Sequence, residues 1–501
     1  MDPIPTSLLK QLLPALLPSI TTIINRSLET GTFPTSFRHA LVVPLIKKSS
    51  LNKEMLKNYR PVSNLHFISK ILEKVVQKQL FSHMTKCNLH QKMQSAYKAK
   101  HSTETALLRV ANDILCQIDK KCGTILVLLD LSAAFDTIDH ETLLKLLQDK
   151  FGLHGIVLKW FTSYLSNRSS AVTIDGESSK PSTSSYGVPQ GSVLGPVIFT
   201  MYTSPLVNIV SHHGLSFHCY ADDTQLYLSF EASSPSDLHK TIAKVEDCVL
   251  DIKRWMSDNL LKLNDDKTEV LIITSPYFKK RIPELVLKVD NSSITPSLNA
   301  RNIGVIFDNT LSMKDHVHDL CRRAMFQIKA LSSIRCYISQ HACETMVHSL
   351  ITSKIDYCSS LLAGLPIKTI KRLQHLQNIA ARLVAKSRSE DVTPIMRDLH
   401  WLPVEQRIKF KLLLIVFKCV HDMAPPYLAE LITPYTPALN LRSASSCKLV
   451  VPCTRSGYGD RAFCRIGPVY WNDLPSDLRA LNDFREFKAG LKTHLFQEHF
   501  G

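Results

Sequence analysis

Two adjacent acids in an apolar and aromatic segment constrain the fold of this chain more than any other feature. Asp222 and Asp223 stand in residues 217–230, where most of the other side chains are apolar or aromatic. Such a segment predicts two strands joined by a tight turn that carries both carboxylates. A solvated turn explains them, because Asp is common in turns. A metal site explains them as well, because Mg²⁺ prefers oxygen ligands and neutralises paired carboxylates.

A third acid follows another predicted strand. Residues 124–129 form an apolar run that is typical of a buried strand, and Asp130 comes directly after it. Three carboxylates can hold two metal ions, which is the arrangement that nucleotidyl transfer requires. Asp136 and Asp139 are alternative ligands close by, but their positions favour the start of a helix.

The alternation of helical and strand-like patterns predicts a mixed α+β fold up to about residue 307. Helical apolar spacing occupies residues 6–30, 70–84, 102–119, 140–151 and 238–261. Strand-like runs occupy residues 40–46, 269–274 and 303–307. From about residue 310 to Val420 the pattern is almost wholly helical, and beyond Tyr427 it becomes irregular. No stretch is apolar over the length needed to cross a membrane, so we expect an intracellular protein without a membrane partner.

The charge balance points to a polyanionic partner. Sixty Lys and Arg residues against forty-four Asp and Glu residues give a net charge of +16. Nucleic acid is the leading partner class, because binding of cations to its phosphates releases counterions. The alternative is a solvated basic surface without a specific partner. The thirteen cysteines include no CxxC pair, so reduced thiols are expected rather than a zinc site.

Seven ordered sequence blocks resemble the reverse transcriptases of LINE-like (non-LTR) retrotransposons, most closely the jockey-like and chicken-repeat-like branch. The blocks are VPLIKK (43–48), NYRPVSN (58–64), QSAYKAKH (94–101), DLSAAFDTIDH (130–140), GVPQGSVLGP (187–196), YADD (220–223) and NDDKTE (264–269). Segments 400–404 (HWLPV) and 468–475 (PVYWNDLP) resemble blocks found after the polymerase core in the same branch. The resemblance therefore covers nearly the whole chain.

The resemblance implies a right-hand polymerase of fingers and palm, followed by a mainly helical thumb and a C-terminal region. We expect residues 1–27 to extend the fingers as a helix and residues 28–306 to form the reverse transcriptase domain. Residues 307–420 would then form the helical thumb-like region. Residues 421–501 would form a C-terminal region to which no role is assigned.

The resemblance also implies an RNA-directed DNA polymerase, which extends the 3′-hydroxyl of a DNA primer on an RNA template with deoxynucleoside triphosphates. Asp130, Asp222 and Asp223 match the ligands of two Mg²⁺ ions, for which Mn²⁺ can substitute. Lys267 matches the lysine proposed to protonate the pyrophosphate leaving group, a role that needs a suitable pKa and reach.

Further matches fall on residues that would contact the incoming nucleotide. Phe135 matches the steric gate that excludes a ribose 2′-hydroxyl, although a core phenylalanine is the alternative. Gln190 and Gly191 match the lining of the nucleotide pocket, with a simple loop-to-helix junction as the alternative. Three cations occupy the finger segment that folds over the nucleotide, where they would offset triphosphate charge or, for the two lysines, face solvent: Lys47, Lys48 and Arg60.

Residues 367–388 predict a basic amphipathic helix that contains no acid. It could lie along the phosphates of a template-primer duplex, or merely present a solvated face. Its candidate contacts are Lys368, Lys371, Arg372, Arg382 and Lys386. The aromatic residues of the two C-terminal blocks, Trp401, Tyr470 and Trp471, are candidates for core packing or for stacking on RNA.

Similar retrotransposons encode an endonuclease ahead of the polymerase, so we expect this chain to be a fragment without that domain. The competing hypothesis is a catalytically dead relic that only binds nucleic acid. A maturase-like intron reverse transcriptase shares the polymerase blocks but fits the helical C-terminal half less well. The family resemblance implies a nuclear or cytoplasmic ribonucleoprotein.

Overall fold

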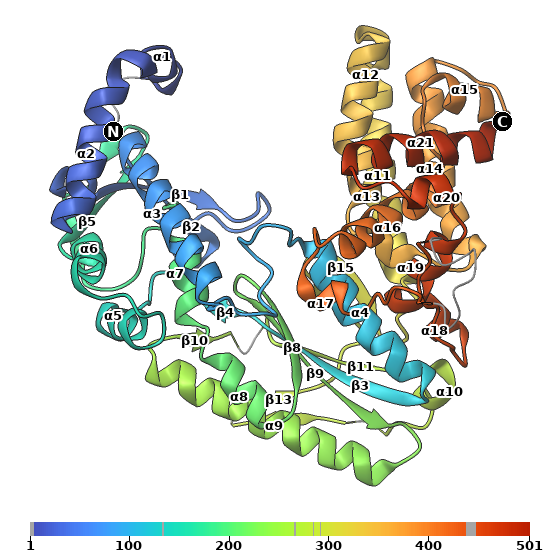
Figure 1. Ribbon diagram of the computed structural model, residues 1–501, viewed down its shortest axis with the longest axis horizontal. Helices are drawn as coiled ribbons and strands as arrows, with labels where there is room; N and C mark the ends of the chain where they lie inside the picture. The colour runs from blue at the N-terminus through green and yellow to red at the C-terminus, as the bar shows by residue number, and fades with distance from the viewer. Residues whose placement is uncertain (1–4, 133–134, 265–266, 284, 291, 437–446) are drawn as a thin grey trace. The chain divides into compact units, whose positions relative to one another are not determined.

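The computed structural model describes residues 5–436 and 447–501, apart from residues 133–134, 265–266, 284 and 291 (Figure 1). The chain forms two compact units that interleave along the sequence. The first unit comprises residues 1–97, 130–212 and 248–266, and the second comprises residues 98–129, 213–247 and 267–501. Each unit is thus assembled from several separate stretches of chain. The domain boundaries expected from the resemblance stay predictions.

A mixed sheet lies in the first unit. Its strand order is β2-β1-β5-β6, and β7 also pairs with β5. Strand β1 runs antiparallel to β2 and parallel to β5. The bounds of these strands are β1 His39–Ile46, β2 Tyr59–Asn64, β5 Arg168–Ile174, β6 Glu177–Ser178 and β7 Ser182–Ser184. A separate short pair joins β4 (Leu131–Ser132) to β10 (Lys262–Leu263).

The helices of the first unit confirm the helical patterns of its sequence. The predicted helix over residues 6–30 is divided at Leu12 into two and ends at Gly31, whose positive φ of 62° suits a glycine cap. The helices are α1 Thr6–Gln11, α2 Leu13–Thr30, α3 Phe67–Lys86, α5 His140–Asp149, α6 Gly155–Leu165, α7 Gly195–Tyr202 and α8 Leu206–His212. Helix α9 (Pro235–Asp258) has residues in both units.

The second unit is built on an antiparallel sheet in the order β11-β3-β9-β8 (Figure 1). Its strands are β3 Cys122–Leu129, β8 Ser216–Tyr220, β9 Asp223–Glu231 and β11 Glu269–Ile273. Ile125, Leu126 and Val127 are buried, which confirms the prediction of a buried strand. The short hairpins β12 (Leu287–Val289) with β13 (Ser292–Ile294) and β14 (Asn299–Asn302) with β15 (Val305–Asp308) complete the strands described in this unit.

Helix α4 (Thr103–Asp119) packs against β3 and β8, and C-terminal segments hold its other side. Figure 1 shows α17 and α18 beside the two ends of α4. The Arg109 guanidinium binds the carboxylates of Asp113 and Glu430. Near the far end of α4, the Asp119 carboxylate accepts the backbone N–H of Arg455 at 2.9 Å. The C-terminal region is therefore part of the support of the sheet.

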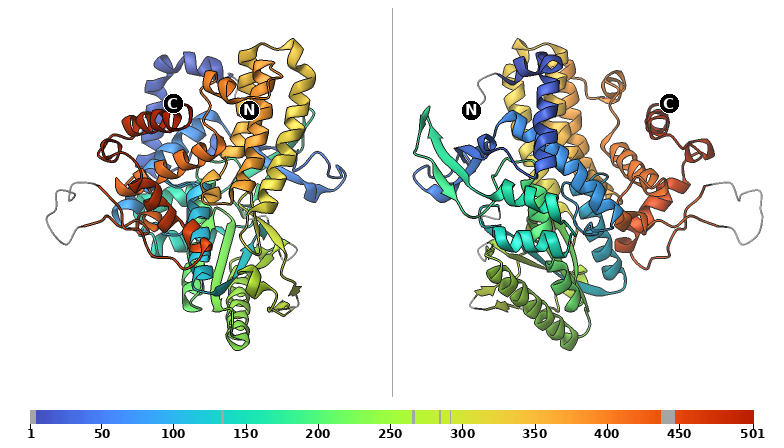
Figure 2. Two further views of the ribbon diagram at one scale, coloured as in Figure 1. Left: turned by 90° about the vertical axis from the view of Figure 1, so that its right-hand side faces the viewer. Right: turned by 60° about the vertical axis from the view of Figure 1, so that its left-hand side comes forward.

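Residues beyond 310 are mainly helical, as predicted (Figure 2). The helices there are α11 Lys314–Ile334, α12 Gln340–Val347, α13 Ser353–Asp356, α14 Ile367–Ala385, α15 Thr393–Asp398, α16 Val404–Val420, α17 Pro426–Ala429, α18 Gly457–Arg461, α19 Phe463–Asn472, α20 Ser476–Arg479 and α21 Phe484–Phe500. The short helix α10 (Pro276–Lys279) precedes them. The prediction of irregular structure after Tyr427 is wrong, because α19 and α21 form there. Within the described ranges, no helix is both long and apolar enough to span a bilayer.

Candidate active site

The paired acids lie at a two-residue hairpin turn, which confirms the hairpin predicted from the sequence. Tyr220 of β8 pairs with Asp223 of β9, so Ala221 and Asp222 form the turn itself. Ala221 has a φ of 58°, as the first central residue of such a hairpin loop requires. Asp222 is half-buried and Asp223 is exposed. A tight turn thus presents two adjacent acids at the end of the β8–β9 hairpin.

The end of β3 lies beside this hairpin within the same sheet. Leu129, the last residue of β3, pairs with Thr224, the residue after Asp223. Asp130 is the next residue of the chain and is half-buried. Its carbonyl accepts the backbone N–H of Asn264 at 2.9 Å, and its carboxylate lies 3.4 Å from the Asn264 side-chain amide. The β4–β10 pairing therefore holds the backbone at Asp130.

The three predicted metal ligands are divided between the two units. Among the residues that the structure describes, no three acid, histidine or cysteine side chains are grouped so that they could hold one ion. Asp130 belongs to the first unit, whereas Asp222 and Asp223 belong to the second. The assignment of these three acids as ligands stays a prediction that rests on donor chemistry and on the strand register.

The two other acids of this segment have different environments. The Asp139 carboxylate accepts the backbone N–H of Thr142 at 2.8 Å and caps α5, so its interpretation as a helix-start acid is confirmed. Asp136 is exposed as a residue, yet desolvation of its carboxyl raises its pKa. Lys267 is exposed two residues before β11. Ala133, Ala134, Asp265 and Asp266 of the resembling blocks lie outside the described residues.

The glycine-containing loop before α7 is held between two other segments of the first unit. The N–H groups of Gly187 and Val188 donate to the carbonyls of Ile138 and Phe135, each at 2.8 Å. The carbonyl of Gln190 accepts the N–H of Ser63 of β2 at 2.7 Å. These bonds fix Gln190 beside the segment that carries Phe135.

Both outer glycines of this loop are required by close backbone contacts. Gly187 has a φ of 78°, and a Cβ atom there would lie 2.7 Å from the Asp136 carbonyl oxygen. Gly191 has a φ of 126°, and a Cβ atom there would lie 2.6 Å from the Ser63 carbonyl oxygen. Larger residues would clash with backbone, which a flexible side chain cannot relieve.

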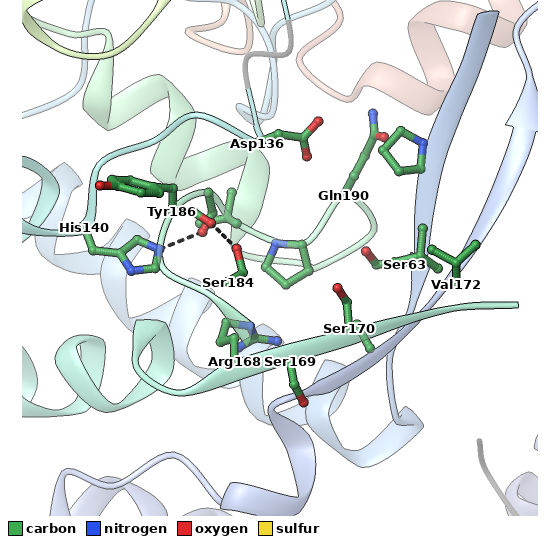
Figure 3. Close-up of a pocket in the computed structure, with 16 residues that line it drawn as sticks. Ser63, Asp136, His140, Arg168, Ser169, Ser170, Val172, Ser184, Tyr186 and Gln190 are labelled. Atoms are coloured by element: carbon green, nitrogen blue, oxygen red, sulfur yellow. Dashed lines mark hydrogen bonds between the residues drawn. The ribbon is translucent and has the colours of Figure 1, made fainter. Parts of the chain in front are cut away.

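A cavity of about 310 Å³ adjoins this loop (Figure 3). Ser63, Asp136, His140 and Gln190 lie around it, with Arg168 at its lower side in that view. The Gln190 side-chain oxygen is buried and has no hydrogen-bond partner within the described part of the chain. The His140 ring bonds the Gly187 carbonyl at 2.8 Å. The cavity therefore has a rigid backbone wall, beside which the buried Gln190 amide oxygen is unpaired.

Phe135 is half-buried, and its ring centroid lies 5.3 Å from that of Phe199 on α7. The residue thus packs on one side and keeps part of its ring accessible. This arrangement suits either a steric gate or a peripheral core residue.

The candidate triphosphate cations lie at the end of the β1–β2 pair where the connecting segment joins the two strands. Arg60 pairs with Leu45, and the N–H of Lys47 donates to the carbonyl of Asn58 at 2.8 Å. Lys47, Lys48 and Arg60 are all exposed. The Lys47 ammonium donates to the Lys57 carbonyl at 2.7 Å. The strand register therefore brings these three cations to one end of the hairpin.

The cations of the predicted basic helix α14 do not form one surface. Lys368, Lys371 and Arg372 are exposed along a groove between α14 and α11. Arg382 instead donates to the carbonyls of Ser389 and Glu390, each at 2.8 Å. Lys386 is exposed at the C-cap of α14, with a φ of 52°. Only the first three share a groove.

The tryptophans of the C-terminal blocks are core residues. Trp401 is 4% exposed, and its indole N–H donates to the Glu344 carboxylate at 3.2 Å. Trp471 is fully buried. Tyr470 is half-buried, and its pKa is raised by desolvation. Stacking on RNA is therefore not the role of either tryptophan.

Sequence reasoning missed Glu73, which holds the start of α7. The residue lies on α3 and is fully buried. One carboxylate oxygen accepts the N–H groups of Val193 and Leu194, at 2.7 and 3.1 Å, and the other accepts the Ser69 hydroxyl at 3.2 Å. Burial raises the pKa of Glu73. A charged residue on the buried face of a predicted helix is the signal that could have identified it.

We predict that Glu73→Leu destabilises the chain and raises KM for deoxynucleotides. Glu73→Gln should keep most of the stability and a KM close to that of the unaltered chain. Leucine would leave two buried N–H groups without an acceptor, at a cost of about 1–3 kcal/mol for each. An amide oxygen can still accept them. Urea unfolding and primer-extension kinetics measure the two effects. Equal behaviour of the Leu and Gln variants would contradict the role of this acceptor.

The reverse transcriptase (RNA-dependent DNA polymerase) family model matches residues 46–307, slightly more than half of the chain. The chain is 26% identical over 401 residues to the probable RNA-directed DNA polymerase from transposon BS of Drosophila melanogaster, covering 77% of this chain and 42% of that protein. It is 27% identical to the probable RNA-directed DNA polymerase from transposon X-element of Drosophila melanogaster, and the match covers 73% of this chain and 39% of that protein. The chain is also 31% identical over 208 residues to the RNA-directed DNA polymerase from mobile element jockey of Drosophila melanogaster. That match covers 40% of this chain and 22% of the jockey protein.

The chain spans less than half the length of these relatives. Among solved structures, apo telomerase from Candida tropicalis matches with a TM-score of 0.42 and 10% identity, covering 79% of this chain and 67% of that one.

Proposed function

Because the chain belongs to the reverse transcriptase family, we propose that it is the polymerase part of a jockey-like LINE element and copies an RNA template into DNA. The observation that carries this proposal is the hairpin turn with Asp222 and Asp223 beside the end of β3, the strand that leads into Asp130. We propose that the chain acts with its RNA template and a DNA primer as a ribonucleoprotein, in the nucleus or the cytoplasm.

Asp130, Asp222 and Asp223 would hold two divalent ions, Mg²⁺ or, in its place, Mn²⁺. Carboxylate oxygens are the donors that Mg²⁺ prefers, so the residues fit the ion. When bound, the ions neutralise charge on the attacking and leaving oxygens. The turn at Ala221 fixes the backbone of the acid pair, and the bond from Asn264 fixes that of Asp130. These contacts fix the backbone positions from which the carboxylates extend.

The loop of Gln190 and Gly191 would receive the nucleotide. Its backbone bonds to Phe135 and Ser63 give it a fixed shape, and the unpaired Gln190 amide oxygen offers an acceptor. The cations of the β1–β2 hairpin, Lys47, Lys48 and Arg60, would bind the triphosphate, and Lys267 would donate the proton to the departing pyrophosphate. Deoxynucleotide incorporation on a primed RNA template, with Mg²⁺, tests the proposal. A folded chain that binds the template but adds no nucleotide would favour the catalytically dead relic.

Phe135→Val is predicted to relax sugar selection. If the exposed part of the ring blocks a ribose 2′-hydroxyl, then its removal lowers the preference for deoxynucleotides over ribonucleotides by about tenfold or more. The ratio of kcat/KM for the two nucleotide classes measures this preference. A variant with reduced stability but an unchanged ratio would instead identify Phe135 as a core residue that packs on Phe199.

A further inference from the structure

Helices α11 and α14 of the second unit pack side by side and border an open groove of about 540 Å³. Four permanent cations and two imidazoles line it: Arg322, Lys368, Lys371, Arg372, His318 and His375. Leu376 and Met325 provide apolar surface between them. No acidic side chain is among the described residues that line the groove.

The positive charge of this groove is only partly compensated. Of the groove cations, Arg322 pairs with Asp319 of α11 at 2.9 Å. The same carboxylate also pairs with Arg301 and Arg323, which do not line the groove, at 3.2 and 2.9 Å. On α14, the Arg372 guanidinium lies 3.1 Å from Nδ1 of His318. Because Arg only donates, this ring nitrogen is the acceptor in the contact. The groove is therefore suited to an anionic chain of phosphates.

An exposed aromatic ring continues the same face of α11. Phe326 follows Arg322 by four residues and His318 by eight, a spacing that places all three along one side of the helix. The Phe326 side chain is 70% exposed. Lys329, three residues further on, is also exposed. A flat apolar ring among cations is the combination that holds unpaired bases and phosphates together.

We infer that the α11–α14 groove binds a single-stranded polynucleotide, with its cations on the phosphates and the Phe326 ring stacked on a base. Stacking on a side chain needs a base that is free of its partner strand, which a duplex does not offer along its length. The inference deepens the proposed function, because it gives the polymerase a holding site for unpaired template. Binding can be measured without nucleotide addition, so its failure is distinct from failure of polymerisation.

The test is fluorescence anisotropy of the full chain with a short single-stranded RNA, the same sequence as DNA, and the RNA in a duplex. Phe326→Ala is expected to weaken binding of single strands by about tenfold and to leave duplex binding unchanged. Phe326→Trp should keep the affinity, because the larger ring also stacks. A difference between the RNA and DNA arms would identify which strand the groove prefers.

The salt dependence of binding tests the role of the cations separately. Lys368→Ala with Lys371→Ala should lower the slope of log affinity against log salt by about 1.4, since each single-strand phosphate contact contributes about 0.7. Two variants are the matched controls. Tyr277→Ala removes another exposed ring (59%) and matches Phe326→Ala. Lys488→Ala with Lys492→Ala removes two exposed lysines of α21 and matches the lysine pair of the groove. Unchanged single-strand affinity in Phe326→Ala, an equal loss for duplex, or an equal loss in the controls would overturn the inference.

Discussion

Asp130→Asn is expected to lower the rate of primer extension by about a thousandfold or more, which corresponds to about 4 kcal/mol of transition-state stabilisation. The amide keeps the shape of the side chain but removes the negative charge that a divalent ion requires. Because the Asp130 backbone is held by Asn264, the substitution should leave the local fold intact. Single-turnover extension of a primed RNA template measures the rate.

Asp136→Asn is the matched control for this prediction. Asp136 lies six residues further on, is exposed, and was one of the two other acids of this segment that sequence alone left open as ligands. Because Asp136 lines the cavity beside Gln190, the rates are compared at saturating deoxynucleotide, where its substitution should change the rate by no more than about threefold. A large loss in Asp136→Asn together with a mild effect in Asp130→Asn would transfer the ligand role to Asp136.

Trp471→Ala is expected to destabilise the second unit by about 3–5 kcal/mol, the usual cost of removing a large buried aromatic residue. Trp471 is fully buried, and its ring centroid lies 5.6 Å from that of Phe487 on α21 and 6.4 Å from that of Phe417 on α16. Its indole N–H donates to the Cys447 carbonyl at 2.8 Å. One side chain therefore joins three helices and the segment before α18.

Urea unfolding of the variant measures this loss, with Val469→Ala as the control. Val469 lies on the same helix and is 40% exposed, so its truncation should cost less than about 0.5 kcal/mol. Because the C-terminal segments bind α4, which packs on the sheet that carries Asp222 and Asp223, the tryptophan variant should also lose the proposed activity as it unfolds. Equal stability of the two variants would show that the aromatic cluster does not hold this region.

The hairpin and the buried strand could be predicted because their signals are local. The apolar and aromatic segment around Asp222 and the apolar run before Asp130 each need only about fifteen or fewer neighbouring residues to interpret. The role of Glu73 could not be predicted, because its partners Val193 and Leu194 are 120 and 121 positions away. Which N–H groups a buried carboxylate accepts depends on two segments that are distant in sequence, so no local sequence pattern reveals it.

The C-terminal helices show a second limit of sequence reasoning. Helix α19 contains Gly467 and Pro468, which are typical of helix ends, so its pattern resembled irregular structure. Packing of Phe463 and Trp471 in the core overrides this local preference. On α14, neighbouring cations differ in role: Arg382 binds two carbonyls of the following loop, whereas Lys368 lines the groove. Charge alone does not distinguish them.

The most direct test of the central claim is deoxynucleotide incorporation on a primed RNA template with Mg²⁺. The unaltered chain is compared with a double variant that carries Asp222→Ala and Asp223→Ala. Both acids lie at a hairpin turn, so their loss should leave template binding and folding unchanged. We predict synthesis by the unaltered chain and none by the double variant. Equal synthesis by both, or none by an unaltered chain that is folded and binds RNA, would contradict the proposal.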